Sequence, residues 1–371
     1  MREILAGTLL LVMGMGFGRF AFTDLYPQMV SDGIFDQHAG AWVASANYAG
    51  YLAGALLLTW RHAWRAETLC RIGLFGSLAC LLAMALVQGV AMALLLRFLA
   101  GVASAFSLVG ASLWLLRPGH NAQAAPLLYS GVGLGILLSA ELLVFGQANG
   151  LDSSGLWLLL GMVALLVSLP VWRALARQTQ PLKHHNLSTE HISLPAWRLV
   201  ALYGLAGLGY IITATYLPLL LGGRGELQPL HLWAGFGLGA VPSCFIWQAL
   251  RQRRGTSPAL ALNLSLQGLG VILPTLHPGT ASYLLSALLV GGTFMGTVTI
   301  AMAAVRASPR LAAGMTASYG LGQILGPLLA TALQAHYQSF SPALLAAGAA
   351  LGLAALLSLR PRCNGPAGYA D

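Results

Sequence analysis

Four charged side chains stand inside runs of otherwise apolar residues. They are Arg19, Asp24, Arg97 and Glu141. A charge in such a run is costly to bury, and in membrane proteins it usually belongs to a functional site. A carboxyl group can take up and release a proton, and a guanidinium can hold an anionic group by two parallel hydrogen bonds. These residues therefore predict proton transfer, anion binding or both.

Three of these charges are expected at one depth. Counted from the outward end of its run, each of Arg19, Arg97 and Glu141 lies roughly six to eight residues deep, at about 1.5 Å per residue. We expect Glu141 to carry a coupling proton, with Arg97 and Arg19 beside it. Arg19 can pair with Glu141, bind an anionic group of a substrate, or share both roles, and a static ion pair is the structural alternative. Asp24 lies nearer the outer edge, where it is either functional or simply solvated.

Polar and aromatic side chains in other runs could hold the rest of a substrate. The second half of the chain has no charge inside its apolar runs, but it offers tyrosines, a phenylalanine and uncharged hydrogen-bonding groups. Such groups suit an apolar ligand body with a few hydrogen bonds, although aromatic residues are also ordinary helix packing. The expected substrate-binding set is Arg19, Asn47, Tyr51, Tyr210, Thr213, Tyr216, Phe294, Tyr319 and Gln323.

The elements that must position these residues are long apolar helices. Of the 371 residues, 57% are hydrophobic and 8% are charged, whereas a soluble domain carries about 25% charged residues. Runs long enough to cross a hydrocarbon layer of about 30 Å recur along the chain. They predict an all-α membrane protein with twelve transmembrane helices, near 4–27, 39–60, 68–88, 91–116, 125–147, 155–173, 197–221, 231–250, 258–277, 281–305, 312–334 and 341–359.

The distribution of basic residues predicts the orientation of these helices. With the N-terminus inside, 16 of the 19 Lys and Arg residues fall on cytoplasmic segments or their membrane edges. This asymmetry is the positive-inside rule, and it places both termini in the cytoplasm. The net charge of +9 is therefore a sign of topology rather than of a nucleic-acid partner. We expect a multi-pass protein of the cell (inner) membrane, whose partners are the lipid bilayer, protons and a small-molecule substrate.

An internal repeat divides the chain into two pseudo-symmetric six-helix halves. The segment GFGRFAFTDLYP (16–27) aligns with GLGYIITATYLP (207–218), and GLGILLSA from Gly133 resembles GLGQILGP from Gly320. The predicted units are 1–173, a cytoplasmic linker at 174–196, and 197–371 with a short cytoplasmic tail. Parallel repeats of this kind are one plan of secondary transporters, with the substrate site between the halves.

The chain resembles the major facilitator superfamily. The resemblance lies in the twelve spans, the central loop and the motif RFLAG (97–101) on span 4. Within the superfamily, GFGRFAFT on span 1, ANYAGYLAGAL on span 2 and RFLAGVASAF on span 4 resemble the YbfB/YjiJ-type subfamily. Two departures stand out: the loop after span 2 has basic residues but no Asp, and Asp24 occupies a position where the subfamily often has proline.

The resemblance implies a twelve-helix secondary transporter that moves a small organic solute by alternating access. We expect coupling to protons, and the glycine run of span 5 loosely resembles the superfamily's antiporter motif, which favours export over uptake. A monomer is expected. The alternatives are a channel or a non-transporting membrane sensor, and, less favoured, an intramembrane enzyme.

Other chemistries lack their sequence signatures. The glycines at 14, 16 and 18, and at 131, 133 and 135, do not follow a strand of a βαβ unit, so they indicate close helix packing rather than a dinucleotide site. His184, His185, His191 and Glu190 share one polar loop, where solvated side chains are expected rather than a closed metal site. No hydrolase motif or catalytic dyad is present, so we expect no enzymatic activity, no cofactor and no metal.

Overall fold

The computed structural model describes residues 2–60, 64–116, 124–176, 194–220, 229–305 and 308–359, and these contain helices but no strand. In chain order the helices are α1 (Arg2–Leu11), the π-helix η1 (Val12–Phe20), α2 (Phe22–Ser31), α3 (Gln37–Trp60), α4 (Ala66–Met84), α5 (Val90–Leu115), α6 (Ala124–Ala148), α7 (Ser153–Ala176), α8 (Ala196–Leu220), α9 (Pro229–Arg254), α10 (Thr256–Leu276), α11 (Thr280–Ala304), α12 (Pro309–Tyr337) and α13 (Ser341–Ser358). Most of the linker predicted at 174–196, with His184, His185, His191 and Glu190, lies outside the described residues.

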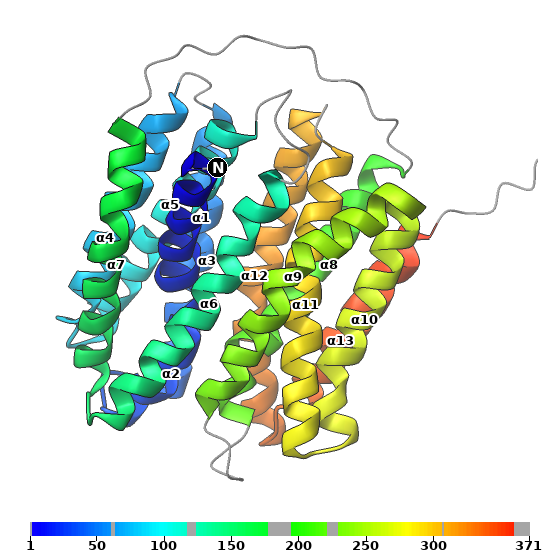
Figure 1. The fold of residues 1–371 in the computed structure, drawn as a ribbon. Helices are drawn as coiled ribbons and strands as arrows, with labels where there is room; N and C mark the ends of the chain where they lie inside the picture. The colour runs from blue at the N-terminus through cyan, green and yellow to red at the C-terminus, as the bar shows by residue number, and fades with distance from the viewer. Residues whose placement is uncertain are drawn as a thin grey trace, which may run out of the picture.

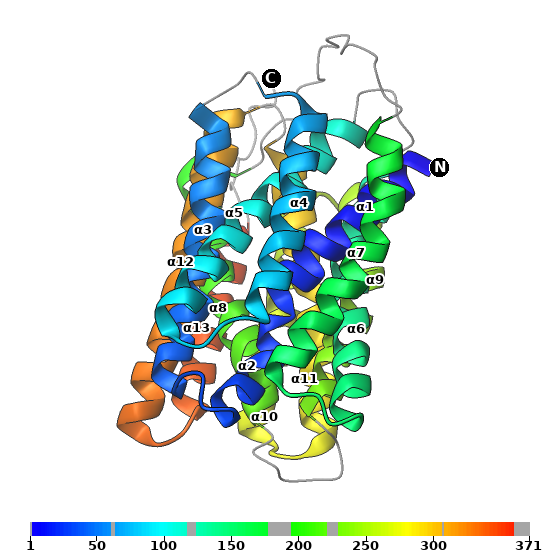
Figure 2. The ribbon, with the colours of Figure 1, turned by 90° about the vertical axis from the view of Figure 1, so that its left-hand side faces the viewer.

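The described chain is an all-α membrane protein. Counted with α1, η1 and α2 as one span, it has twelve long helices, and ten of these are long and apolar enough to cross a membrane. The other two, α9 and α12, have 26 and 29 residues, which is ample length for a crossing. Figure 2 shows the first span running the height of the molecule, from α1 beside the N-terminus to α2 at the opposite end.

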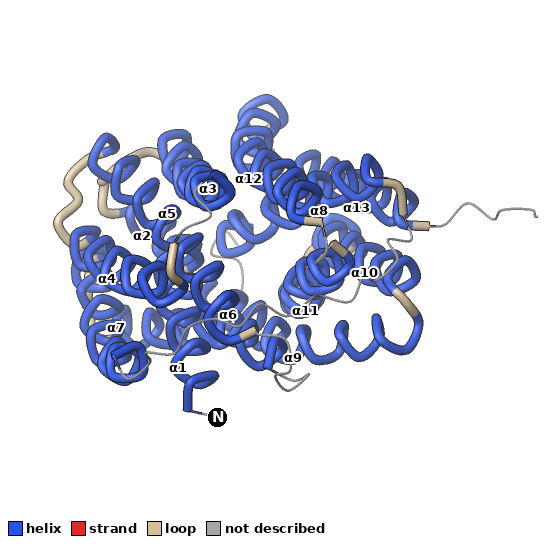
Figure 3. The backbone as a smooth tube through the Cα atoms, turned by 90° about the horizontal axis from the view of Figure 1, so that it is seen from above, coloured by secondary structure: helices blue, strands red, loops and turns tan. Residues whose placement is uncertain are grey.

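The helices gather in two groups. In Figures 1 and 3, α1 to α7 lie on one side and α8 to α13 on the other. The most extensive contacts between the groups are made by two pairs, α6 with α9 and α3 with α12. Large side chains fill the interior, and Trp114, Trp157 and Trp233 are all nearly inaccessible to solvent.

Glycines set the closest helix contacts. A side-chain carbon added at Gly133 of α6 would lie 2.6 Å from the backbone nitrogen of Val241 in α9, and one at Gly135 would lie 2.6 Å from the carbonyl oxygen of Val12 in η1. Real Cβ atoms essentially never approach other atoms so closely, so these positions need glycine. The glycines of α6 therefore allow close contact with both η1 and α9, which confirms the expectation that they serve helix packing.

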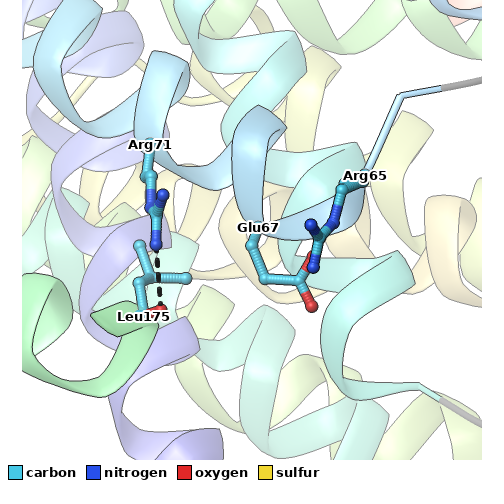
Figure 4. A network of polar contacts seen from close by, with 4 residues as sticks. All are labelled: Arg65, Glu67, Arg71 and Leu175. Carbon is cyan, nitrogen blue, oxygen red and sulfur yellow. Dashed lines mark hydrogen bonds and ion pairs between the residues drawn. The ribbon is translucent and has the colours of Figure 1, made fainter. Parts of the chain in front are cut away.

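Basic residues cluster at one end of α4 (Figure 4). Arg65 forms an ion pair with Glu67 at 3.8 Å, and Arg71 donates a hydrogen bond of 3.3 Å to the carbonyl oxygen of Leu175 near the end of α7. A cation near the C-terminus of a helix interacts favourably with its last carbonyl groups. The arginines at this end thus contact helix termini and solvent rather than the interior.

Candidate functional site

The first span is interrupted at the height of Arg19. Residues Val12–Phe20 form a π-helix whose last backbone bond runs from the Ala21 amide to the Gly16 carbonyl at 3.0 Å. Regular α-helical bonds resume with Leu25, which donates to the carbonyl of Ala21. Glycine has no Cβ and therefore adopts backbone conformations that other residues avoid, which makes such a departure easier. π-helical turns inside α-helices occur frequently at functional sites.

Arg97 of α5 holds this interruption together. Its Nη1 donates to the carbonyl oxygen of Gly18 at 2.7 Å, and its Nη2 donates to that of Arg19 at 2.8 Å. The guanidinium also lies 4.6 Å from the centre of the Phe22 ring, and the residue is only 2% exposed. In a membrane interior, backbone carbonyls need a partner within the protein. Arg97 supplies it here, so its contacts are to the backbone of the first span and not to a carboxylate.

Arg19 reaches from the interruption toward the second group of helices. Its Nη2 donates a hydrogen bond of 2.8 Å to Oε1 of Gln323 in α12, and the amide of Gln323 donates a short hydrogen bond to the hydroxyl of Tyr210 in α8. Arg19, Tyr210 and Gln323 are each at most 3% exposed. One buried hydrogen-bonded chain therefore joins the first span to two helices of the other group.

Aromatic rings surround the Arg19 guanidinium. Its central carbon lies 4.0 Å from the ring centre of Tyr51, 5.3 Å from that of Tyr48 and 5.4 Å from that of Phe20. Arginine within about 6 Å of a ring centre is attracted to its electron-rich face. These rings stabilise the cation without neutralising its charge.

A second group of aromatic rings packs around Tyr210. Tyr210 stacks on Phe294 of α11 at 5.5 Å and on Tyr319 of α12 at 5.7 Å between ring centres. Phe294 in turn meets Phe20 edge-on at 5.8 Å. The site thus combines one cation with flat apolar surfaces from both groups of helices.

The structure brings six of the nine expected substrate-binding residues into this cluster: Arg19, Tyr51, Tyr210, Phe294, Tyr319 and Gln323. It adds Tyr48 and Phe20, which the sequence analysis did not include. The signal for Tyr48 was present, because it precedes Tyr51 by three residues and so shares its side of the helix. Phe20 directly follows Arg19.

The other three lie apart from the cluster's contacts. Asn47 donates to the carbonyl of Arg97 at 2.9 Å and so ties α3 to α5. The hydroxyl of Tyr216 bonds to the carbonyl of Pro327 at 2.9 Å and to Thr331 at 2.7 Å. Thr213 is buried, and its hydroxyl has no hydrogen-bond partner among the described residues.

The expected meeting of Glu141 with the two arginines is wrong. Glu141 is exposed on α6, and the described residues contain no ion pair between it and Arg19 or Arg97. The buried side of α6 carries Ile136, Ala140 and Leu143, and successive helix positions turn by about 100°. The count along the helix gave the height of Glu141 but not the direction in which it points.

Asp24, unlike Glu141, is buried. Its side chain is 3% exposed, and neither carboxyl oxygen has a hydrogen-bond partner among the described residues. The interpretation of a solvated residue at the outer edge is therefore wrong. Arg19 is also incompletely satisfied, since its Nε and Nη1 are buried without a partner in the described part of the chain.

Comparisons with known proteins agree with this architecture. Residues 11–359 match a protein family described as "Uncharacterised MFS-type transporter YbfB". The crystal structure of a point mutant of the nucleoside transporter NupG is similar, with a TM-score of 0.71 over 96% of this chain and 98% of that one. The identity is 15%, so this likeness concerns the fold alone. No curated protein matched the sequence.

Proposed function

Because the chain belongs to the major facilitator family described as MFS-type transporter YbfB, and is a multi-pass secondary transporter rather than an enzyme, we propose that its substrate is a small organic anion moved in exchange with or alongside protons. The substrate binds to the cluster around Arg19, which includes Tyr51, Tyr210, Phe294, Tyr319 and Gln323. The two groups of helices act as the two halves that rock about this site, with α6 against α9 and α3 against α12 as the surfaces between them.

The observation that carries the proposal is the incomplete hydrogen bonding of Arg19. A buried guanidinium costs about 3 kcal/mol or more in a membrane interior unless it is paired. Here Gln323 accepts one of its bonds, and no described carboxylate forms an ion pair with it. Nε and Nη1 remain as donors, and the Nη2 hydrogen that does not bond to Gln323 forms a parallel pair with one of them. A carboxylate or similar anion can accept two parallel bonds from a guanidinium, which no neutral ligand matches in strength.

The aromatic walls support an apolar, flat body for this anion. Tyr51 presents its ring face to the guanidinium. Tyr210, whose hydroxyl bonds to Gln323, stacks on Phe294. Ligand sites commonly combine such apolar surface with a small number of polar groups that fix orientation. An anionic group at Arg19 and a planar carbon skeleton between the rings match both parts of the site.

Transport by the purified protein in liposomes tests this function. We expect uptake of small aromatic carboxylates, with 4-hydroxybenzoate as the first probe, to saturate and to respond to an imposed pH gradient. The matched control is 4-hydroxybenzamide, which has the same ring without the negative charge, and protein-free liposomes correct for passive entry. Uridine, a nucleoside, tests the substrate class named for NupG. Equal transport of the acid and the amide would exclude an anion-binding role for the site.

The distribution of basic residues supports the proposed orientation, and the resemblance of the span 5 glycine run to the antiporter motif supports the proposed direction of transport. We propose export rather than uptake, an inner-membrane location, a monomer and cytoplasmic termini. Single cysteines at Asn149, beyond the end of α6, and at Gln252, near the end of α9, test the orientation because both residues are exposed. In a variant without Cys70, Cys80, Cys244 and Cys363, an impermeant thiol reagent should label residue 149 and not 252 in intact cells. The reverse pattern contradicts the orientation.

A further inference from the structure

A buried carboxyl group without a partner stands beyond the substrate site. Asp24 lies in α2, four positions after Phe20, which is about one helical turn farther along the span. It is 3% exposed, and both of its carboxyl oxygens lack a hydrogen-bond partner among the described residues. Buried carboxylates are normally paired or hydrogen-bonded, because an uncompensated charge in a medium of low polarity is strongly unfavourable.

The surface opposite this part of the span carries a complementary group. The Phe20 ring lies 6.4 Å from the ring of Trp233 in α9 and 5.8 Å from that of Phe294 in α11, and α2 also contacts α9. Trp233 is fully buried, yet its indole N–H has no acceptor among the described residues. Buried tryptophans usually satisfy this donor. An unpartnered acceptor and an unpartnered donor thus lie in adjoining parts of the contact between the two groups of helices.

No neighbouring cation pairs with Asp24 in the described part of the chain. The first span itself carries Arg19, whose bond goes to Gln323 and whose ring contacts are with Phe20, Tyr48 and Tyr51. Arg97 of α5 faces the Phe22 ring and donates to two backbone carbonyls, not to Asp24. The helices packed against α2 carry further titratable groups toward the same end. None of the following forms a hydrogen bond or ion pair with Asp24 in the described structure: His38 and Tyr48 on α3, Glu141 on α6, Tyr216 on α8 and His231 on α9.

We propose that Asp24 is the group that binds the coupling proton, and that it is a neutral acid in the arrangement described here. When the halves move apart along the contact between α2 and α9, water reaches the carboxyl group and accepts its proton. The carboxylate that forms takes up a proton again only when the site opens to the opposite side, so the proton is released on one side of the membrane and bound from the other. This inference rests on the proposed proton-coupled transport, and it replaces Glu141 with Asp24 as the proton carrier.

Infrared spectroscopy of the purified protein tests the neutral acid without any substrate. We expect the carbonyl stretching band of a protonated carboxyl group at neutral pH, and we expect side-chain isotope labelling of aspartate to shift it. The other described aspartates, Asp32, Asp36 and Asp152, are exposed, so the band reports on Asp24. It should vanish in Asp24→Asn and persist in Glu141→Gln. A wild-type protein without an aspartate band of this kind overturns the proposal.

Transport measurements separate proton coupling from substrate binding. With 4-hydroxybenzoate as the probe, Asp24→Asn should keep exchange of labelled for unlabelled compound and lose accumulation driven by a pH gradient. Glu141→Gln should keep both, because that carboxyl group is exposed. If Asp24→Asn still concentrates the probe as the wild type does, Asp24 is not the proton carrier. If the wild type itself exchanges no 4-hydroxybenzoate, the anion proposal fails, whereas the infrared result still decides the state of Asp24.

Discussion

Replacing Arg19 with lysine lowers transport of an anionic substrate about ten- to a hundredfold while the protein still folds and inserts. Hydrogen bonds to charged groups contribute about 1.5–3 kcal/mol each, and about 1.4 kcal/mol corresponds to a factor of ten. Lysine keeps the positive charge but loses the planar arrangement of donors. It cannot both donate to Gln323 and present two parallel bonds to an anion. Arg19 can, because the second hydrogen of Nη2 forms a parallel pair with Nε or with Nη1, both of which are unoccupied.

Initial rates of 4-hydroxybenzoate exchange in liposomes measure this loss, and gel filtration of the purified variant checks the fold. Arg71→Lys is the matched control. That arginine is exposed, and its hydrogen bond is to the carbonyl of Leu175 at a helix end, so its replacement should leave exchange near the wild-type rate. Near-normal exchange by both Arg19→Lys and Arg19→Gln would leave Arg19 as a packing residue only.

Replacing Arg97 with leucine destabilises the folded protein itself. The change removes the donors to the carbonyls of Gly18 and Arg19, which lie in the buried interruption of the first span. A buried acceptor left without a partner costs about 1–3 kcal/mol, so the two together cost about 2–6 kcal/mol by the same estimate. We expect a large fall in the midpoint of thermal unfolding in detergent and poor recovery of monodisperse protein.

Arg71→Leu again provides the comparison, since it removes an arginine that donates to one backbone carbonyl at an exposed position. Its midpoint should fall little, because water can replace the lost donor. Arg97→Lys should be intermediate, as the ammonium group can reach one carbonyl more readily than two. An Arg97→Leu protein as stable as the wild type would show that the π-helical turn needs no partner from α5.

The sequence by itself was sufficient to predict the helices and to select several of the residues that meet around Arg19. Apolar run lengths and the scarcity of charge predict membrane-spanning helices, because a bilayer admits few other structures. The sequence analysis grouped Arg19, Tyr51, Tyr210 and Gln323 as expected substrate-binding residues, and these four do meet. Glycine spacing predicted close packing of span 5, and Gly133 and Gly135 lie at such contacts.

Only the tertiary structure decided how the other charges are used. Counting residues gives the height of a side chain along its helix, but the direction in which it points depends on which face packs against neighbours. Glu141 therefore lies on the exposed side of α6, whereas Asp24, for which a functional and a solvated position were both open, is buried. The partners of Arg97 are backbone carbonyls exposed by a π-helical turn. In the structure η1 packs against α4, α5 and α6, and its three glycines permit such a turn without specifying it.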